Sequence, residues 1–456
     1  MKRTVLMSVL GALLVTAPIA IANSAPGVTQ VTLKNGLRVT IVPSKRLPLV
    51  DLRLVARAGS VNDPAGREGL ARMTAELLTQ GAGKRSAQDV AEAIEFVGGS
   101  LSASAGSEQF AVSLEVLSKD LGTGLDLFGA VVSQPAFATE ELERKREEAL
   151  GRIASDKSEP SVIAEQAFAR VLWGDSPLAH PLIGNEASIK AMTRDDVVSF
   201  HRRFVTPQRS ALIVVGDVDP KAIVAQLERA LGAWKGAGDP LSDPYRSPPQ
   251  VKGRRIRIVD KPEATQAQIR LGCIGVPRSH PDYYAMRVAN TILGSGFTSR
   301  LVNSIRVEQG LTYSINSQFP MYRNAGLFRI TTFTRSEQLR KCVDAVLAEV
   351  KKLVDEGPTQ AELDKARNYL SGQYPIGLQA PDDLAAEWAN VKFFDLPQDA
   401  IAQFNGSVMA VTMDDVKRVL RERVCVSDLQ MVVVAKAEMA SKALEGLGEI
   451  EVVKID

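Results

Sequence analysis

The chain has 456 residues, 45% of them hydrophobic and 24% charged, a composition typical of globular proteins with large cores and long enough for two to four domains. Its formal net charge is only +2, and removing Lys2 and Arg3 leaves 53 basic against 53 acidic residues. Such a balance argues against nucleic acid or an anionic surface as the main partner.

The N-terminus predicts a secretory signal peptide over residues 1–22. Lys2 and Arg3 form a basic region, residues 5–15 are mostly apolar, and Ala20-Ile21-Ala22 is a small-x-small cleavage site. An uncleaved membrane anchor is the alternative, but the apolar run is short of the ~20 residues that span a bilayer. We therefore expect a protein exported across the inner membrane, periplasmic, and without a membrane span after cleavage.

The first half alternates strand and helix patterns. Residues 31–42 are rich in β-forming residues around Asn35-Gly36, a strong signal for a hairpin, and residues 49–58 predict another strand. Periodicity then predicts further strands and helices. The strands cover 100–105 and 109–117, and the helices cover 69–78, 87–97, 121–132 and 140–155.

The second half repeats the first. Thr193-Arg-Asp-Asp-Val197 reappears as Thr412-Met-Asp-Asp-Val416, and each copy predicts a threonine-capped helix. An apolar strand follows each copy, at residues 210–215 and 429–434. A second echo, Glu141-Leu-Glu-Arg144 against Glu362-Leu-Asp-Lys365, occurs in the same order, and two such markers favour duplication over chance similarity.

A segment rich in Pro, Gly, Ser and Asp, residues 236–254, predicts a linker between the halves. It separates a first domain, residues 28–235, from a second domain, residues 255–453. The order of strands and helices in each half indicates an α+β fold, with helices packed on a mostly antiparallel sheet.

Residues 298–314 carry the most informative chemistry. Apolar residues at helical spacing predict an amphipathic helix that ends at Gly310, with Arg306 in its last turn. Tyr313 is expected to begin the next extended run. The guanidinium and the phenol could converge across this turn and bind a peptide carbonyl. A solvated cation and a half-buried strand aromatic are the structural alternatives.

Three segments together resemble the pitrilysin/insulinase metallopeptidases, a family that includes the mitochondrial processing peptidases. They are residues 59–76, Gly216-Asp-Val218 and the Arg/Tyr segment 298–314. The resemblance extends over residues 28–453 and implies that the two α+β domains form a clam-like pair.

The family's zinc motif, His-x-x-Glu-His on a helix, is degenerate here. Arg72 and Glu76 stand at the histidine positions, and Ala75 stands at the position of the catalytic glutamate. At the later glutamate ligand, Gly151 and Arg152 stand instead. Arg72 and Glu76 lie four apart and are expected to pair with each other. We therefore expect no metal ligands and no zinc cofactor in this chain.

The resemblance implies that Arg306 and Tyr313 bind substrate near the scissile carbonyl and stabilise its developing charge. It also implies a partner, a homologous chain with an intact zinc motif, and a peptide or unfolded protein as substrate. The chain would be a secreted non-catalytic subunit of a heterodimeric zinc metalloendopeptidase. The alternative is a peptide-binding or structural protein of the same fold without peptidase activity.

Other candidate residues are weaker. Ser295, between two glycines, lacks the flanks of a nucleophile elbow, and residues 294–300 are a candidate lining of the substrate path. His180 is expected to be a loop or packing residue. Only three histidines occur, so a non-metal hydrolase with a nucleophile–His–acid triad has little support.

The three cysteines, Cys273, Cys342 and Cys425, all lie in the second half. An odd number does not indicate a disulfide framework, and we expect small buried apolar side chains. The alternative is a single structural disulfide, which could form in an oxidising compartment.

Overall fold

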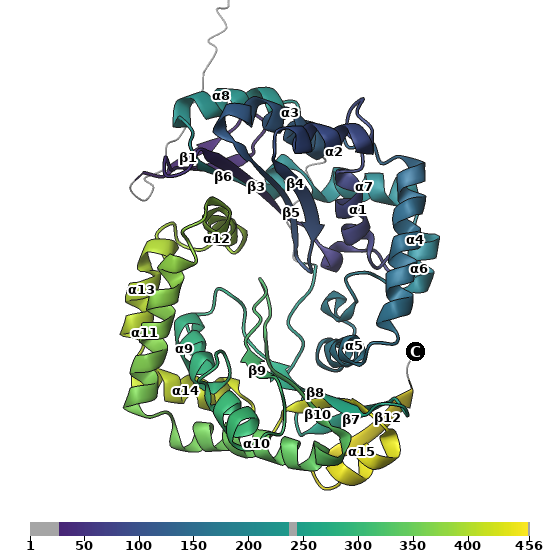
Figure 1. The fold of residues 1–456 in the computed structure, drawn as a ribbon, viewed down its shortest axis with the longest axis vertical. Coiled ribbons are helices and arrows are strands. Elements are labelled where there is room, and N and C mark those ends of the chain that lie inside the picture. The colour runs from purple at the N-terminus through teal and green to yellow at the C-terminus, as the bar shows by residue number, and fades with distance from the viewer. Residues whose placement is uncertain (1–26, 237–243, 455–456) are drawn as a thin grey trace, which may run out of the picture.

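Two six-stranded sheets form the framework of the protein. The computed structural model describes residues 27–236 and 244–454, so the predicted signal peptide lies outside the described residues. One sheet lies in each half of the chain, and the two halves face each other across the molecule (Figure 1). The predicted α+β class and the clam-like pair of domains are confirmed.

The first sheet has the strand order β1-β2-β6-β3-β5-β4. Its neighbours are antiparallel except for β2 and β6, which run parallel. The predicted hairpin around Asn35-Gly36 joins β1 to β2, with Thr32 opposite Arg38. The bounds are β1 Thr29–Thr32, β2 Arg38–Pro43, β3 Leu49–Arg57, β4 Ser100–Ala105, β5 Gln109–Leu117 and β6 Ser210–Gly216.

The second sheet has the order β12-β7-β11-β8-β10-β9 and repeats the pairing of the first. The central pair β7–β11 is parallel, like β2–β6, and β8 is antiparallel to β11, as β3 is to β6. Only the outer strand differs, because β12 adds parallel to β7 where β1 adds antiparallel to β2. This shared topology supports the duplication predicted from the sequence. The bounds are β7 Arg255–Asp260, β8 Gln266–Ile274, β9 Ile315–Gln318, β10 Leu327–Arg335, β11 Gln430–Ala435 and β12 Glu449–Lys454.

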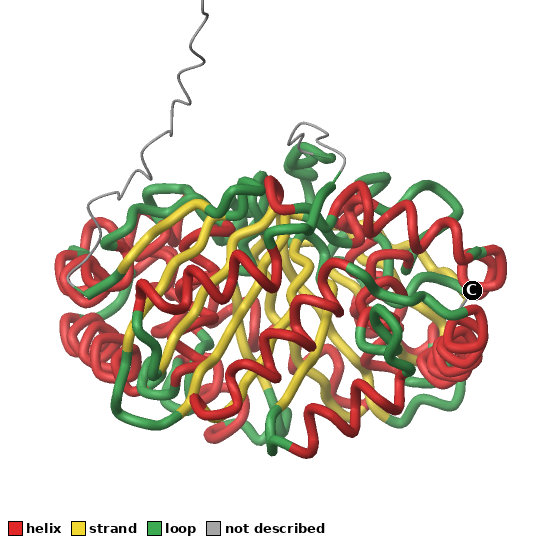
Figure 2. The backbone as a smooth tube through the Cα atoms, turned by 90° about the horizontal axis from the view of Figure 1, so that it is seen from above, coloured by secondary structure: helices red, strands yellow, loops and turns green. Residues whose placement is uncertain are grey.

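Most helices lie toward the two sides of the molecule, with the strands between them (Figure 2). The predicted threonine caps are present, since Thr193 Oγ1 accepts from Asp196 N at 3.2 Å and Thr412 Oγ1 accepts from Asp415 N at 3.1 Å. In the first half the helices are α1 Leu70–Leu78, α2 Ala87–Phe96, α3 Leu121–Ser133, α4 Thr139–Asp156, α5 Pro160–Trp173, α6 Glu186–Ala191, α7 Arg194–Phe204 and α8 Pro220–Leu231. In the second half they are α9 Tyr283–Leu293, α10 Leu339–Glu356, α11 Gln360–Ile376, α12 Pro381–Phe393, α13 Ala400–Ala410, α14 Met413–Arg423 and α15 Ala437–Leu444.

One helix from each half packs on the sheet of the other half. Helix α12 packs on β3 and β6 of the first sheet, and α5 packs on β8 and β11 of the second (Figure 1). Trp388 of α12 belongs to one buried apolar cluster with Ile213, and Phe168 of α5 belongs to another with Val432. The exchange buries apolar surface on both sides and thereby holds the halves together.

An ionic network adds to this connection between the halves. Asp395, which follows α12, pairs with Arg57 of β3 and with Arg323 at 3.3 Å. Glu108, at the turn between β4 and β5, accepts from Arg323 N at 3.0 Å and from the hydroxyl of Tyr245. Tyr245 belongs to the predicted linker, whose described residues, 236 and 244–254, lie in no helix or strand.

The expectation for the cysteines is wrong for two of the three. Cys273 of β8 and Cys425, which follows α14, form a disulfide, whereas Cys342 is free and buried in α10. The partners are 152 residues apart, and the pairing of β11, which follows Cys425, with β8 brings them together.

Candidate functional site

The degenerate motif lies on α1, and two of its side chains form an ion pair with each other. Arg72 Nε donates to Glu76 Oε1 at 2.7 Å, which confirms the predicted pair, and Ala75 is buried. The carboxylate of Asp63 caps the N-terminus of α1, because it accepts hydrogen bonds from Gly69 N and Ala71 N, both at 2.8 Å.

The second part of the motif does not supply a ligand either. Arg152, on α4, donates to Asp156 at 3.0 Å along its own helix, and its side chain is 68% exposed. Within residues 27–236 and 244–454, no three His, Cys, Asp or Glu side chains are grouped to hold a metal ion. A guanidinium repels a cation, so the side chains at these positions do not fit zinc.

A cavity of about 460 Å³ lies beside Arg72, between the two halves. Arg270 and Arg329 reach it from the second sheet, and both contact Glu165 of α5. Burial lowers the pKa of the Arg270 guanidinium, and the charge of Glu165 opposes this shift. The arginine and glutamate side chains at this cavity are therefore partnered with one another.

The sequence analysis did not single out this arginine–glutamate cluster. Arg270 was the available signal, because it is a charged residue within the otherwise apolar end of β8, and it is only 4% exposed. His180 also lines the cavity from a bend between α5 and α6, as expected for a loop residue. Its Nδ1 is buried and has no hydrogen-bond partner among the described residues.

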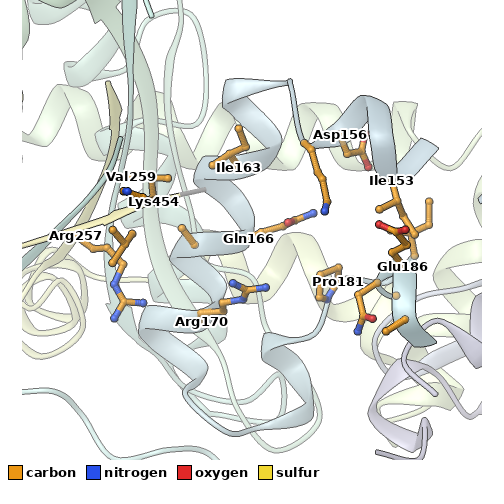
Figure 3. A pocket seen from close by; sticks show the side chains of 17 residues that line it. Ile153, Asp156, Ile163, Gln166, Arg170, Pro181, Glu186, Arg257, Val259 and Lys454 are labelled. Carbon is orange, nitrogen blue, oxygen red and sulfur yellow. The ribbon is translucent and has the colours of Figure 1, made fainter. Parts of the chain in front are cut away.

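A second cavity between the halves, of about 420 Å³, is shown in Figure 3. Gln166 and Arg170 of α5 line it, opposite Arg257 of β7 and Asp156 at the end of α4 (Figure 3). Arg257 donates to Glu451 at 2.9 Å, and Asp156 is the partner of Arg152. Each of these pairs lies within one half, the first between β7 and β12 and the second along α4.

The other two histidines lie elsewhere. His201 is buried in the first core, where its Nε2 lies 3.0 Å from the Val132 carbonyl oxygen, and burial lowers its pKa to about 4. His280 lies in the second half, and its Nδ1 accepts from Asp282 N at 3.2 Å. The three histidines therefore do not meet at one site.

The Arg/Tyr segment departs from its expected form in two ways. Residues Val302–Glu308 form a π-helix, not an α-helix, and helices of this rare type are frequent at functional sites. Gly310 has φ of 59°, in agreement with the predicted left-handed end. Tyr313 precedes β9 in a loop and is 77% exposed, so it does not begin the strand.

The two side chains meet. The guanidinium carbon of Arg306 lies 5.1 Å from the centre of the Tyr313 ring, in a cation–π contact. Across the part of the chain that the structure describes, neither the Arg306 guanidinium nor the Tyr313 hydroxyl has a hydrogen-bond or ion-pair partner. Their donors are thus oriented together and available to a ligand.

Comparison with known proteins places two family models on the chain. The model described as insulinase (peptidase family M16) matches residues 38–186, and the model described as peptidase M16 inactive domain matches residues 191–370. An uncharacterized zinc protease of Mycobacterium leprae is 31% identical over 361 residues, covering 78% of this chain and 80% of that protein.

Solved structures share the fold. A crystal structure of a peptidase M16 inactive domain from Pseudomonas fluorescens is 27% identical with a TM-score of 0.84, covering 90% of this chain and 97% of that one. The periplasmic protease PqqL from Escherichia coli is 16% identical with a TM-score of 0.79, covering 95% of this chain and 48% of that one, which shows the fold alone.

Proposed function

Because the chain belongs to the insulinase (M16) family of peptidases, we propose that it is the zinc-less subunit of a two-chain metalloendopeptidase. A homologous partner chain with an intact His-x-x-Glu-His motif would supply the zinc ion and the general base. This chain would supply Arg306 and Tyr313 as donors to the peptide substrate.

One observation carries the proposal. The chain has hydrogen-bond donors available to a substrate carbonyl oxygen, whereas the side chains of its degenerate zinc motif pair with each other. Arg306 and Tyr313 are in contact, but their polar ends have no partner among the described residues. Arg72 and Glu76 instead satisfy each other on α1. A cation–π contact at an exposed site contributes only about 0.5–1 kcal/mol, and it leaves the hydrogen-bond donors of both side chains available to a ligand.

The donors fit the chemistry of peptide hydrolysis. Negative charge develops on the carbonyl oxygen as the peptide bond is attacked, and fixed donors stabilise that charge without reorganising. The guanidinium keeps its charge at any physiological pH and the phenol adds a neutral donor. Binding and orienting the carbonyl oxygen is the role that we assign to this chain.

Secretion to the periplasm is part of the proposal. The basic and apolar pattern of residues 1–22 supports export, and the Cys273–Cys425 disulfide suits an oxidising compartment. In the described ranges, no helix is both long and apolar enough to cross a membrane.

Co-expression tests the two-chain arrangement. The full chain would be produced with the homologous zinc-bearing chain encoded beside it, and the purified mixture assayed for peptide cleavage with and without a chelator. We expect a stable heterodimer with chelator-sensitive cleavage, and no cleavage by this chain alone. Zinc-dependent cleavage by the lone chain, or a failure of the two chains to associate, would contradict the proposal.

A peptide-binding or structural protein without peptidase activity is the second candidate. The Arg306–Tyr313 pair also suits this function, because it needs no zinc to hold a peptide carbonyl. Peptide binding by the lone chain, together with the absence of any zinc-bearing partner gene, would favour this candidate.

A further inference from the structure

A separate cavity of about 320 Å³ lies in the second half, between the C-terminal end of α9, the following loop and α11. Ile292 and Ala366 form its apolar floor and are 5% and 3% exposed. Phe297 of the loop and Tyr369 of α11 flank it and are 83% and 49% exposed. A cavity of this size, with an apolar floor and aromatic sides, is typical of sites that bind an apolar group.

The loop that carries Phe297 is held in place. A Cβ on Gly294 would lie 2.4 Å from Ser317 Oγ, so only glycine allows this close approach to β9. Gly296 has φ of 149°, a conformation that other residues rarely adopt. Its carbonyl oxygen accepts from Ser299 Oγ at 2.7 Å. The cavity is therefore built into the fold.

Two charged side chains lie at the rim of the cavity, Glu362, which is paired, and Lys365, which is not paired with any described residue. Glu362 accepts from Arg300 Nε at 2.7 Å and from Thr359 N at 2.7 Å, and the hydrogen bond from Arg300 lowers its pKa to about 2. Lys365, one turn along α11, has no hydrogen-bond or ion-pair partner among the described residues. A ligand that fills the cavity would meet an available ammonium group.

The cavity lies close to the Arg/Tyr segment along the chain. Thr298 lines the cavity, and one helical segment leads from it to Arg306, roughly 12 Å at about 1.5 Å per residue. An extended peptide advances about 3.3 Å per residue, so some three to four residues would separate the two contacts. A single bound peptide can reach both.

Resting on the proposed function, we infer that this cavity is a specificity pocket of the same peptide-binding surface. It takes a bulky apolar side chain, preferably aromatic, and Lys365 selects for an acidic residue next to it. The occupant is a segment of the substrate peptide, about three to four residues from the carbonyl that Arg306 and Tyr313 bind. A side chain of the partner subunit is the competing occupant.

Peptide binding to the full chain alone tests the inference, with fluorescence anisotropy as the measurement. Three fluorescein-labelled nonapeptides share glycine and serine flanks and differ only in a central pair: Asp-Phe, Asp-Ala or Lys-Phe. We expect Asp-Phe to bind at least about tenfold more tightly than Asp-Ala, as burial of a phenylalanine side chain implies. We expect it to bind severalfold more tightly than Lys-Phe.

Substitutions locate the binding. Phe297→Ala and Tyr369→Ala should reduce the preference for Asp-Phe over Asp-Ala to less than twofold, and Lys365→Glu should reverse the preference for Asp-Phe over Lys-Phe. All three residues are exposed, so the variants should fold. Phe96→Ala, at a 92% exposed residue of α2, and Lys341→Glu, at an exposed position of α10, are the matched controls and should keep both preferences.

Equal binding of the three peptides by the wild-type chain would overturn the inference, and so would unchanged preferences in the three variants. If Phe297→Ala and Tyr369→Ala instead abolish association with the zinc-bearing chain while peptide preferences stay, the cavity belongs to the subunit interface. These results are independent of the proposed function, which is tested by cleavage. A heterodimer that fails to cleave leaves the binding preferences of the lone chain unaffected.

Discussion

Arg306 and Tyr313 lie in cation–π contact, with 5.1 Å between the guanidinium carbon and the ring centre, at the exposed end of a π-helix. Stacking on the ring orients the guanidinium and restricts its rotamers. The tyrosine hydroxyl and the guanidinium therefore form one two-donor unit, and substitutions can remove each donor separately.

Removing the guanidinium should abolish most of the carbonyl stabilisation. In the assembled pair, Arg306→Ala is expected to lower kcat/KM by about 100- to 1000-fold, the loss typical of a missing oxyanion donor. Assembly should stay intact, because apart from its contact with Tyr313 the guanidinium has no hydrogen-bond or ion-pair partner among the described residues. Steady-state peptide cleavage and size-exclusion chromatography measure the two effects. Arg335→Ala, at an exposed arginine of β10, is the control. Unchanged turnover would assign Arg306 to the solvated surface.

Removing only the hydroxyl of Tyr313 separates its donor from its ring. Tyr313→Phe keeps the cation–π contact, so Arg306 should remain oriented while one donor is lost. We expect turnover to fall by about tenfold or more, with a smaller change in KM, because the donor acts mainly on developing charge. Tyr284→Phe, at a packed tyrosine of the same half, should have little effect. Equal kinetics for Tyr313→Phe and the wild type would leave the ring as the functional group.

The exchanged helix α12 covers a buried carboxyl group whose protonation should affect stability. Asp51 of β3 is 2% exposed, and its Oδ1 has no hydrogen-bond partner among the described residues. Burial raises its pKa to about 7, and the nearby carboxylates of Asp382 and Glu115 add to this shift. Between about pH 4 and pH 7 the folded chain therefore holds a proton that the unfolded chain has released.

The free energy of unfolding should consequently decrease as the pH rises through this range, by at most roughly 4 kcal/mol from this group. Asp51→Asn removes the titration and should flatten the decrease, so the variant becomes more stable than the wild type at pH 8. Urea unfolding at several pH values measures this. Asp344→Asn, on the exposed surface of α10, is the control. Parallel curves for Asp51→Asn and the wild type would contradict the prediction.

The disulfide should contribute measurably to stability. Replacing Cys273 and Cys425 together with serine is expected to lower the free energy of unfolding by about 2–5 kcal/mol, because the bridge closes a long loop in the unfolded chain. A reducing agent should destabilise the wild type but not the double variant. Cys342→Ala, which leaves the bridge intact, should retain the sensitivity to reductant. Thermal unfolding with and without reductant tests this.

Local elements were largely predictable from the sequence because neighbouring residues determine them. The predicted strands at residues 100–105 and 109–117 match β4 and β5, and the capped helices after Thr193 and Thr412 begin as expected. Alternation, capping residues and turn glycines act over a few positions, so their effect is visible in sequence. The degenerate motif was also readable, since Arg72 and Glu76 lie on one turn of α1.

Features that depend on packing between distant segments were not predictable. No local pattern distinguishes a helix that covers its own sheet from one that covers the other, so the exchange of α5 and α12 emerged only from the structure. The same holds for the bridge between Cys273 and Cys425, which requires β11 to pair with β8. By itself, the sequence determined which side chains are available for chemistry. The tertiary structure decided which of them meet, because contacts between residues far apart in the chain depend on how the apolar faces of its helices and sheets pack.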